Sequence, residues 1–300
     1  MRVLVTGATG FIGRQVLPLL TAGGHEVFAV GRRERPPSLV EDVQWHTCDL
    51  LDSAQLSQLL SETGPTDLLH FAWYAEPSRY WSAPENVLWV ESTLQLFRRF
   101  VESGGTRVVM AGTCAEYDLR HGFCSEGLTP LRPTTLYGAS KHAVATVVTT
   151  AAEHLGVSAA WGRIFFLYGP REHPARLVAG VATALLRGEP AACSHGRQLR
   201  DFLHVKDVAS AFVHLLHSDL EGPVNVASGT AVSVGEVALA IGELVGRPEL
   251  VQLGTRSAPA DEPPLIVADV RRLEQEVGWE PRITLTSGLR ETVDWWRHNL

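Results

Sequence analysis

The sequence predicts an α/β protein in which a doubly wound parallel sheet is joined by a smaller, mixed C-terminal part. Short apolar runs alternate with amphipathic stretches from Val3 onward, as expected for parallel strands whose connecting helices cover both faces of the sheet. A glycine-rich turn follows the first apolar run, and the alternation becomes irregular beyond Tyr168. We therefore expect a Rossmann-type dinucleotide-binding domain over residues 1–168 and a substrate-binding part over residues 169–300, with interleaved chain segments.

The composition bounds the class of protein. The 300 residues are 45% hydrophobic and 20% charged, which is enough for a large core. The net charge of −7 gives no reason to expect a nucleic acid partner, and no stretch is long and apolar enough to cross a bilayer. Residues 1–6 run directly into a strand pattern without a signal peptide. A cytoplasmic protein is expected.

The cysteine pattern favours free thiols. The chain has four cysteines, and they show no CxxC spacing: Cys48, Cys114, Cys124 and Cys193. Such scattered cysteines argue against a disulfide framework and against a zinc site. No metal is expected.

The first glycine-rich turn, Gly7-Ala8-Thr9-Gly10-Phe11-Ile12-Gly13, lies between an apolar run and an amphipathic stretch. Glycines at these positions let the backbone turn tightly and approach a pyrophosphate, whose charge is met by amides at the helix N-terminus. The turn therefore predicts a cofactor site formed by Gly7, Gly10 and Gly13, with Phe11 and Ile12 between them. The alternative is a tight strand-to-helix turn without a ligand.

The end of the second predicted strand, residues 25–30, indicates which dinucleotide binds. An acidic side chain there would bond the ribose hydroxyls of NAD, but this chain has Gly31, Arg32 and Arg33. Either arginine is suited to pair with the 2′-phosphate of NADP and to stack on the adenine. NADP(H) is therefore favoured and NAD(H) is possible. The alternative is two solvated arginines on a loop.

Two further strand ends are predicted to reach the same cofactor. Asp49 and Leu50 end the third apolar run, where the carboxylate is placed to accept a bond from the adenine amino group. Phe71 and Ala72 end the fourth run, where the cofactor would pass. Ligands bind at this carboxyl edge in doubly wound sheets.

An aromatic segment precedes the long helix expected over residues 84–101. It contains Trp73, Tyr80 and Trp81. These rings either line a substrate pocket or pack in the core, and the sequence supports both interpretations equally.

Tyr137 and Lys141 are four residues apart, so on a helix they share one face. A tyrosine with its ordinary pKa of about 10 is a poor acid or base at neutral pH, but a neighbouring ammonium favours the phenolate. Thr113 follows the fifth apolar run and is delivered to the same sheet edge. The three side chains therefore form a candidate catalytic group, although a Tyr and Lys pair also occurs on solvated helix faces.

Several motifs in order along the chain resemble the extended short-chain dehydrogenase/reductase superfamily, in its nucleotide-sugar epimerase, dehydratase and reductase branch. The resemblance covers nearly the whole chain. Besides the glycine turn and the Tyr137 and Lys141 pair, it rests on these segments: Arg163 to Phe165, Tyr168 to Arg171, Arg200 to Ala209, Asn225 to Gly229, and Leu273 to Pro281.

The resemblance implies roles for matching residues. Tyr137 would exchange a proton with a sugar hydroxyl or carbonyl, Lys141 would hold the nicotinamide ribose and lower the pKa of Tyr137, and Thr113 would bond the reacting oxygen. Arg200 would grip the nucleotide diphosphate. The remaining predicted substrate-binding positions are Cys114, Phe166 and Asn225. The pair of long helices implies a homodimer.

The departures from the family pattern narrow the reaction. In the related 4,6-dehydratases an acid and a base follow the threonine, whereas here Cys114 and Ala115 follow Thr113. Glu116 falls one place later and would point differently if the strand pleat persisted. Phe166 and Trp89 replace family asparagines, which puts the details of the diphosphate and sugar contacts in doubt. Dehydration is therefore not expected.

The sequence thus predicts an NADPH-dependent reductase of a nucleotide-linked 4-keto-6-deoxy sugar, with Tyr137 as the proton donor. The arginines at the end of the second predicted strand favour NADPH. A reductase would draw on NADPH because it consumes one hydride per turnover. Two alternatives stay open: a nucleotide-sugar 4-epimerase with tightly bound NAD, and a non-catalytic NADP-binding regulator. The nucleotide, the sugar and the stereochemistry are not predicted.

Overall fold

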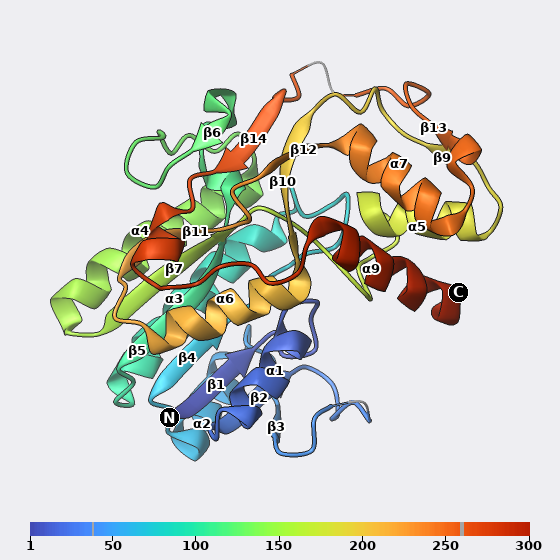
Figure 1. The fold of residues 1–300 in the computed structure, drawn as a ribbon. Coiled ribbons are helices and arrows are strands. Elements are labelled where there is room, and N and C mark those ends of the chain that lie inside the picture. Colours follow the sequence, from blue (N-terminus) through green and yellow to red (C-terminus); the bar gives the residue numbers. More distant parts are fainter. Residues whose placement is uncertain (38, 259–260) are drawn as a thin grey trace.

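A seven-stranded parallel sheet forms the centre of the computed structural model, which describes residues 1–37, 39–258 and 261–300 (Figure 1). The strands, in order across the sheet, are β11 (Gly222–Val226), β7 (Ser158–Ile164), β5 (Arg107–Thr113), β4 (Asp67–His70), β1 (Arg2–Thr6), β2 (Glu26–Gly31) and β3 (Gln44–Thr47). The strand order reverses between β1 and β4, which is where doubly wound sheets bind ligands. The predicted fold class is confirmed.

Helices cover both faces of this sheet because its strands are apolar on both sides. Along β1, Val3 and Val5 point into one buried cluster and Leu4 into the other, as the two-residue period of a strand requires. The first face carries α1 (Gly13–Ala22) and α6 (Val205–His217), and the second carries α2 (Ser53–Thr63), α3 (Glu85–Glu102) and α4 (Leu136–Leu155).

The remainder of the chain builds a second, mixed sheet and a helical group beside it (Figure 1). This sheet has the order β12 (Ala231–Ser233), β10 (Leu199–His204), β14 (Leu265–Ala268) and β6 (Phe123–Cys124), with β8 (Phe166–Tyr168) also paired to β10. The helices α5 (Leu177–Leu186), α7 (Val234–Val245) and α9 (Leu285–Asn299) pack around a third apolar cluster. The short elements are η1 (Cys114–Glu116), η2 (Leu119–His121), η3 (Pro248–Leu250), α8 (Arg271–Gln275), β9 (Ala191–Ala192) and β13 (Val251–Gln252).

The two parts exchange chain segments. From the second half of the chain, β11 extends the large sheet beside β7, and α6 packs against α1. From the first half, β6 pairs with β14 in the mixed sheet. The division of the chain near residue 168 stays a prediction.

Helix ends follow local signals in the sequence. Asp52 begins α2 by accepting hydrogen bonds from two backbone N–H groups of the first turn, and Thr135 begins α4 in the same way with one. Both helices end at glycines with left-handed backbone, Gly64 and Gly156. These signals place the start of α4 so that Tyr137 lies in its first turn.

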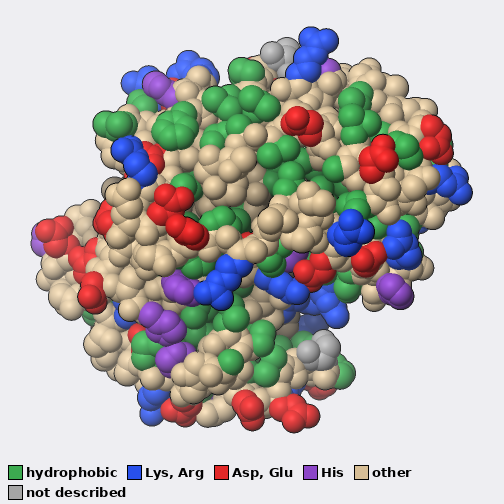
Figure 2. All heavy atoms as spheres, in the orientation of Figure 1, with side chains coloured by type: hydrophobic (Ala, Val, Ile, Leu, Met, Phe, Trp, Pro, Cys, Tyr) green, Lys and Arg blue, Asp and Glu red, His purple; other side chains and the backbone are tan. Residues whose placement is uncertain are grey.

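The surface is mixed in character. On the face in Figure 2, hydrophobic, acidic and basic side chains are interspersed, and Lys and Arg side chains gather near the middle. Within the described ranges no helix is long and apolar enough to span a membrane. All four cysteines are free. The prolines within residues 259–264 predict a rigid connector, and residues 259 and 260 of this segment lie outside the described residues.

Replacing Gly162 by alanine is expected to destabilise the protein. A Cβ at this position of β7 would lie 2.6 Å from Cζ of Phe212, a fully buried ring on α6. Overpacking of this kind costs about 1–3 kcal/mol, which urea unfolding would measure. The matched control is Gly127→Ala, because a Cβ there meets nothing within 4 Å. Equal stability of both variants would contradict the tight packing of α6 on the sheet.

Candidate functional site

The glycine turn after β1 forms a cradle that side chains would fill. Gly7 has a left-handed backbone (φ 66°), and a Cβ there would lie 2.8 Å from the backbone of Phe71 and Ala72 at the end of β4. A Cβ on Gly13 would overlap the carbonyl oxygen of Gly7. The absence of side chains thus leaves backbone amides accessible at the N-terminus of α1, and these residues fit a dinucleotide pyrophosphate.

The cofactor residues predicted at the other strand ends lie at the same edge. Asp49 is partly exposed just beyond β3, and its carboxylate accepts the N–H of Leu51. Leu50 is buried in the core. Ala72 donates its N–H to the hydroxyl of Thr6, which ties the end of β4 to β1. The structure therefore brings the predicted cofactor residues together, and their contacts with a cofactor stay a prediction.

A second pair of arginines, Arg14 and Arg171, lies near the turn and was not among the predicted cofactor residues. Arg32 and Arg33 are exposed beyond β2, as predicted. Arg14 and Arg171 line a small cavity of about 190 Å³ together with Thr9. Burial lowers the pKa of Arg14, and the charge of Arg171 lowers it further. Arg14 directly follows the last glycine of the turn, but only the fold brings Arg171 to it.

The candidate catalytic group assembles at the carboxyl end of β5. Thr113 is the last residue of that strand, and Tyr137 and Lys141 lie on successive turns of α4. Gly138 explains the close approach of these elements, because a Cβ there would overlap the carbonyl oxygen of Ala115 in η1. The spacing of Tyr137 and Lys141 puts both on one face of α4, and Gly138 lets that face lie close to η1.

The aromatic segment packs on Tyr137. The ring centroid of Tyr137 lies 4.9 Å from that of Tyr80, 5.8 Å from that of Trp81 and 6.5 Å from that of Trp73, in near-perpendicular arrangements. The N–H of Tyr137 also donates to the carbonyl oxygen of Trp81. Of the two interpretations left open, the structure shows these rings packed edge-on against Tyr137, which is partly exposed.

Burial sets the protonation of the group. It raises the pKa of Tyr137 well above its ordinary value, and the charge of Tyr80 adds to this, whereas a contact with the Thr113 hydroxyl favours the phenolate. Without ligands the phenol therefore stays neutral at physiological pH. The expected lowering of this pKa by Lys141 stays a prediction.

Lys141 is a buried ammonium, with 3% of its surface exposed. Its Nζ donates to the carbonyl oxygen of Ala111 at 2.9 Å and lies 3.9 Å from the ring centroid of Trp73. Burial lowers the pKa of Lys141 to about 7, and the charge of Glu116 opposes that change. Small changes in its surroundings therefore decide whether this residue is charged near neutral pH.

Among the residues that the structure describes, the segment after Thr113 offers no second acid or base that stands free. Burial raises the pKa of Cys114 to about 12, so its thiol stays protonated, and Ala115 has no titratable group. Glu116 is fully buried and pairs with Arg163 at 2.8 Å. The strand pleat does not continue to Glu116, because η1 begins directly after Thr113. The carboxylate of Glu116 is therefore already engaged in a polar network.

The predicted substrate residues have different environments. The guanidinium of Arg200 pairs with Glu262 at 2.7 Å and lies over the ring of Phe166. Asn225 is fully buried, and its amide bonds Tyr117 and two backbone carbonyls. Contact of these residues with substrate stays a prediction, and for Asn225 it would require one of the existing bonds to be exchanged.

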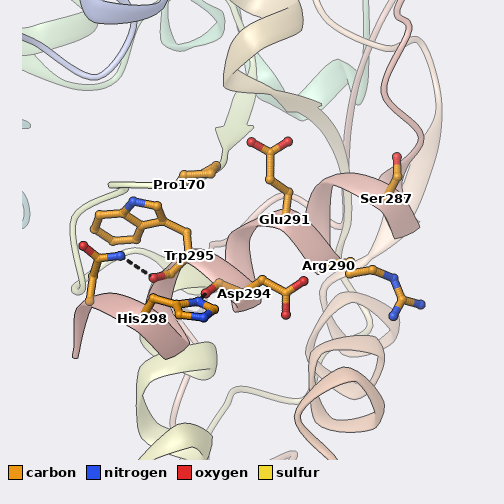
Figure 3. Close-up of a pocket in the computed structure, with 8 residues that line it drawn as sticks. Pro170, Ser287, Arg290, Glu291, Asp294, Trp295 and His298 are labelled. Atoms are coloured by element: carbon orange, nitrogen blue, oxygen red, sulfur yellow. Dashed lines mark hydrogen bonds between the residues drawn. The ribbon is translucent and has the colours of Figure 1, made fainter.

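A hollow of about 620 Å³ along α9 lies apart from these residues (Figure 3). Pro170 and Trp295 face each other across it. The side chains of His298 and Asn299 bond backbone oxygens of their own helix. Polar groups engaged in this way do not converge on a common ligand, so the candidate site remains at β5 and α4.

Comparison with known proteins identifies the family. The model of the NAD dependent epimerase/dehydratase family matches residues 3–227. The UDP-glucose 4-epimerase of Corynebacterium glutamicum is 28% identical over 95% of this chain and 92% of that protein. UDP-glucuronic acid decarboxylase 1 of Xenopus tropicalis is 28% identical over 100% of this chain and 73% of that protein.

A solved structure adds the fold. MoeE5, solved in complex with UDP-glucose and NAD, is 33% identical, covers 99% of both chains and has a TM-score of 0.84. The resemblance to extended short-chain dehydrogenases/reductases is confirmed, and so is the prediction of an enzyme. The chain belongs to the NAD dependent epimerase/dehydratase family.

Proposed function

We propose that the chain is a nucleotide-sugar 4-epimerase that works with a tightly bound NAD. The observation that carries the proposal is the enclosed group of Thr113, Tyr137 and Lys141 without a free acid or base beside it. Such a group supports removal and return of a hydride and a proton at one carbon, and it lacks the partners for elimination. The match to an epimerase over nearly the whole chain supports the same reaction.

In this mechanism the residues of the chain handle the proton and the oxygen. Tyr137, as phenolate, takes the proton of the sugar hydroxyl and later gives it back to the same oxygen, after the keto sugar has presented its opposite face. Thr113 bonds that oxygen throughout, and the ammonium of Lys141 favours the phenolate. When bound in the glycine cradle, the dinucleotide would supply the hydride acceptor and donor for this carbon.

The aromatic enclosure serves this chemistry by excluding water. Tyr80, Trp81 and Trp73 pack against the ring of Tyr137, so a sugar that reaches Tyr137 replaces part of their contact. A dry site strengthens the electrostatic effect of the ammonium and protects the keto intermediate from release into water.

The NADPH-dependent reductase expected from the sequence is supported less well than this epimerase. The reductase argument rests on Arg32 and Arg33, which are exposed. NAD is the dinucleotide bound in MoeE5. NADP(H) stays a second candidate because Arg14 and Arg171 also lie near the turn. Family membership leaves the regulator without support.

The homodimer and the substrate class belong to the same proposal. Val87 and Leu88 on α3 and Val147 on α4 are exposed apolar side chains, as a dimer interface between these helices requires. A UDP-linked sugar is the first substrate to test, since two relatives act on one by name and a third binds one.

The purified protein is expected to retain one NAD per chain and to convert a UDP-hexose to its 4-epimer without added coenzyme. Denaturation followed by mass spectrometry identifies the dinucleotide. A substrate deuterated at C4 is expected to keep its label in the product, because the same hydride returns. Stoichiometric consumption of NADPH with reduction of a 4-keto sugar would instead establish the reductase.

Tyr137→Phe is expected to lower kcat by about 10²–10⁴-fold, the range of a lost general acid–base group. NAD content should not change, because the phenol is not part of the glycine cradle. The matched control is Tyr74→Phe, which alters the same aromatic segment at a ring that is not packed on Tyr137. Full activity of the Tyr137 variant would exclude its role as the proton carrier.

Lys141→Met is expected to change how stability depends on pH. The pKa of Lys141 is about 7 in the folded protein and 10.5 ordinarily, so between these values the folded protein binds fewer protons than the unfolded chain. The free energy of unfolding of the wild type therefore rises with pH in this window. Relative to the variant, it should increase by about 2 kcal/mol between about pH 7 and about pH 9. A constant difference would show that Lys141 does not titrate there.

A further inference from the structure

Glu116 is a fully buried carboxylate beside the candidate site, and the proposed mechanism does not use it. One oxygen, Oε1, accepts the backbone N–H of Thr113 at 2.8 Å and the indole N–H of Trp161 at 2.9 Å. The other, Oε2, accepts Nε–H of Arg163 at 2.8 Å. Three donors from the two neighbouring strands β5 and β7 therefore converge on this one side chain.

We propose that Glu116 is a positioning residue for the catalytic group: it fixes Thr113 at the end of β5, and its negative charge acts on Lys141. The proposal rests on the proposed function only in that Thr113, Tyr137 and Lys141 are taken to act on the substrate. Glu116 itself touches neither the substrate nor the reacting atoms.

The bond to Thr113 determines how its hydroxyl is presented. Glu116 and Thr113 form a reciprocal capping box: the carboxylate accepts the Thr113 N–H, and the Thr113 hydroxyl accepts the N–H of Ala115 at 3.2 Å. The N–H of Ala115 in η1 thereby fixes the orientation of the Thr113 hydroxyl oxygen. Its O–H remains available for Tyr137 or for a sugar oxygen.

Glu116 acts on Lys141 through its charge. The indole that Glu116 holds has its ring centroid 6.0 Å from Nζ of Lys141, on which the ring of Trp73 also packs at 3.9 Å. The negative charge of Glu116 raises the pKa of Lys141 against the effect of burial. The other titratable neighbour, His70, is neutral, because burial and the charge of Lys141 lower its pKa to about 3.

The surroundings make room for Glu116 and hold it in place. A Cβ on Gly112 would overlap the indole nitrogen of Trp161 and lie 2.7 Å from Oε1 of Glu116. Arg163 extends the network through the hydroxyl of Tyr117, at 3.0 Å, to Asn225 on β11. The network therefore links the carboxylate to β7 and to the edge strand β11.

Stability alone does not explain a buried ion pair at this position. Apolar side chains of similar volume are often as stabilising as a buried Glu and Arg pair, because desolvation of both charges is costly. A carboxylate whose bonds end at the catalytic threonine and whose charge acts on the catalytic lysine has a functional role that apolar packing would not supply.

The test replaces Glu116 by glutamine, which keeps the volume and the acceptor for the Thr113 N–H but removes the charge. In the folded, NAD-loaded protein, kcat should fall by on the order of tenfold to a hundredfold, with KM for the nucleotide sugar unchanged. The alkaline limb of the kcat profile should move to lower pH, because Lys141 then loses its proton earlier.

A second readout does not depend on substrate. The titration of Lys141, followed by NMR in lysine-labelled protein and assigned with Lys141→Met, should shift to lower pH in Glu116→Gln. If a wild type inactive on every nucleotide sugar still shows this shift, the proposed function fails and the positioning role stands. An unchanged titration together with wild-type kcat would overturn the positioning role.

The matched control is Asp118→Asn. Asp118 is a buried carboxylate two residues along the same segment that pairs with Arg120, away from Lys141. The Asp118→Asn variant should change neither the titration of Lys141 nor the pH profile of kcat. If Glu116→Gln does not fold because Arg163 is left unpaired, the double variant Glu116→Gln with Arg163→Met removes that charge as well and is expected to show the same shift.

Discussion

The desolvation of one ammonium group is the constraint on which the arrangement of the site depends. Lys141 loses its water when α4 packs against β5 and the aromatic segment, and a buried cation is costly unless protein groups replace its hydration. The replacements come from different parts of the chain: a carbonyl oxygen of β5, the face of Trp73 and, farther away, the charge of Glu116. The same packing also buries the phenol of Tyr137.

Close backbone packing makes this burial geometrically feasible. Gly138 lets the first turn of α4 lie against η1, and Gly7 and Gly13 let the cofactor turn lie against the end of β4 and the start of α1. At each of these positions a methyl group would meet backbone atoms, which cannot move aside as a side chain can. The glycines at the site are therefore needed for the contacts that bring the catalytic group and the cofactor cradle to one edge.

Periodic and local features of the fold were predictable from the sequence, whereas contacts between distant segments were not. The apolar runs and the i, i+4 spacing of Tyr137 and Lys141 depend on neighbouring residues only, so the parallel strands and the shared helix face of this pair were predicted correctly. The pairing of Glu116 with Arg163 joins residues 47 apart, and Arg14 meets Arg171 only in the folded chain. No local pattern reports such pairs.

The neutral phenol is the feature that most restricts how the enzyme can work. Proton transfer from a sugar hydroxyl requires the phenolate, yet burial raises the pKa of Tyr137 and the ammonium of Lys141 bonds Ala111 instead. A group in this state is inactive until something changes its electrostatic surroundings. If the sugar binds as proposed, it displaces part of the aromatic contact and reduces the desolvation of the phenol, while the proposed role of Glu116 keeps Lys141 protonated. In the proposed mechanism, binding and activation are therefore coupled through the same aromatic enclosure that keeps the site dry.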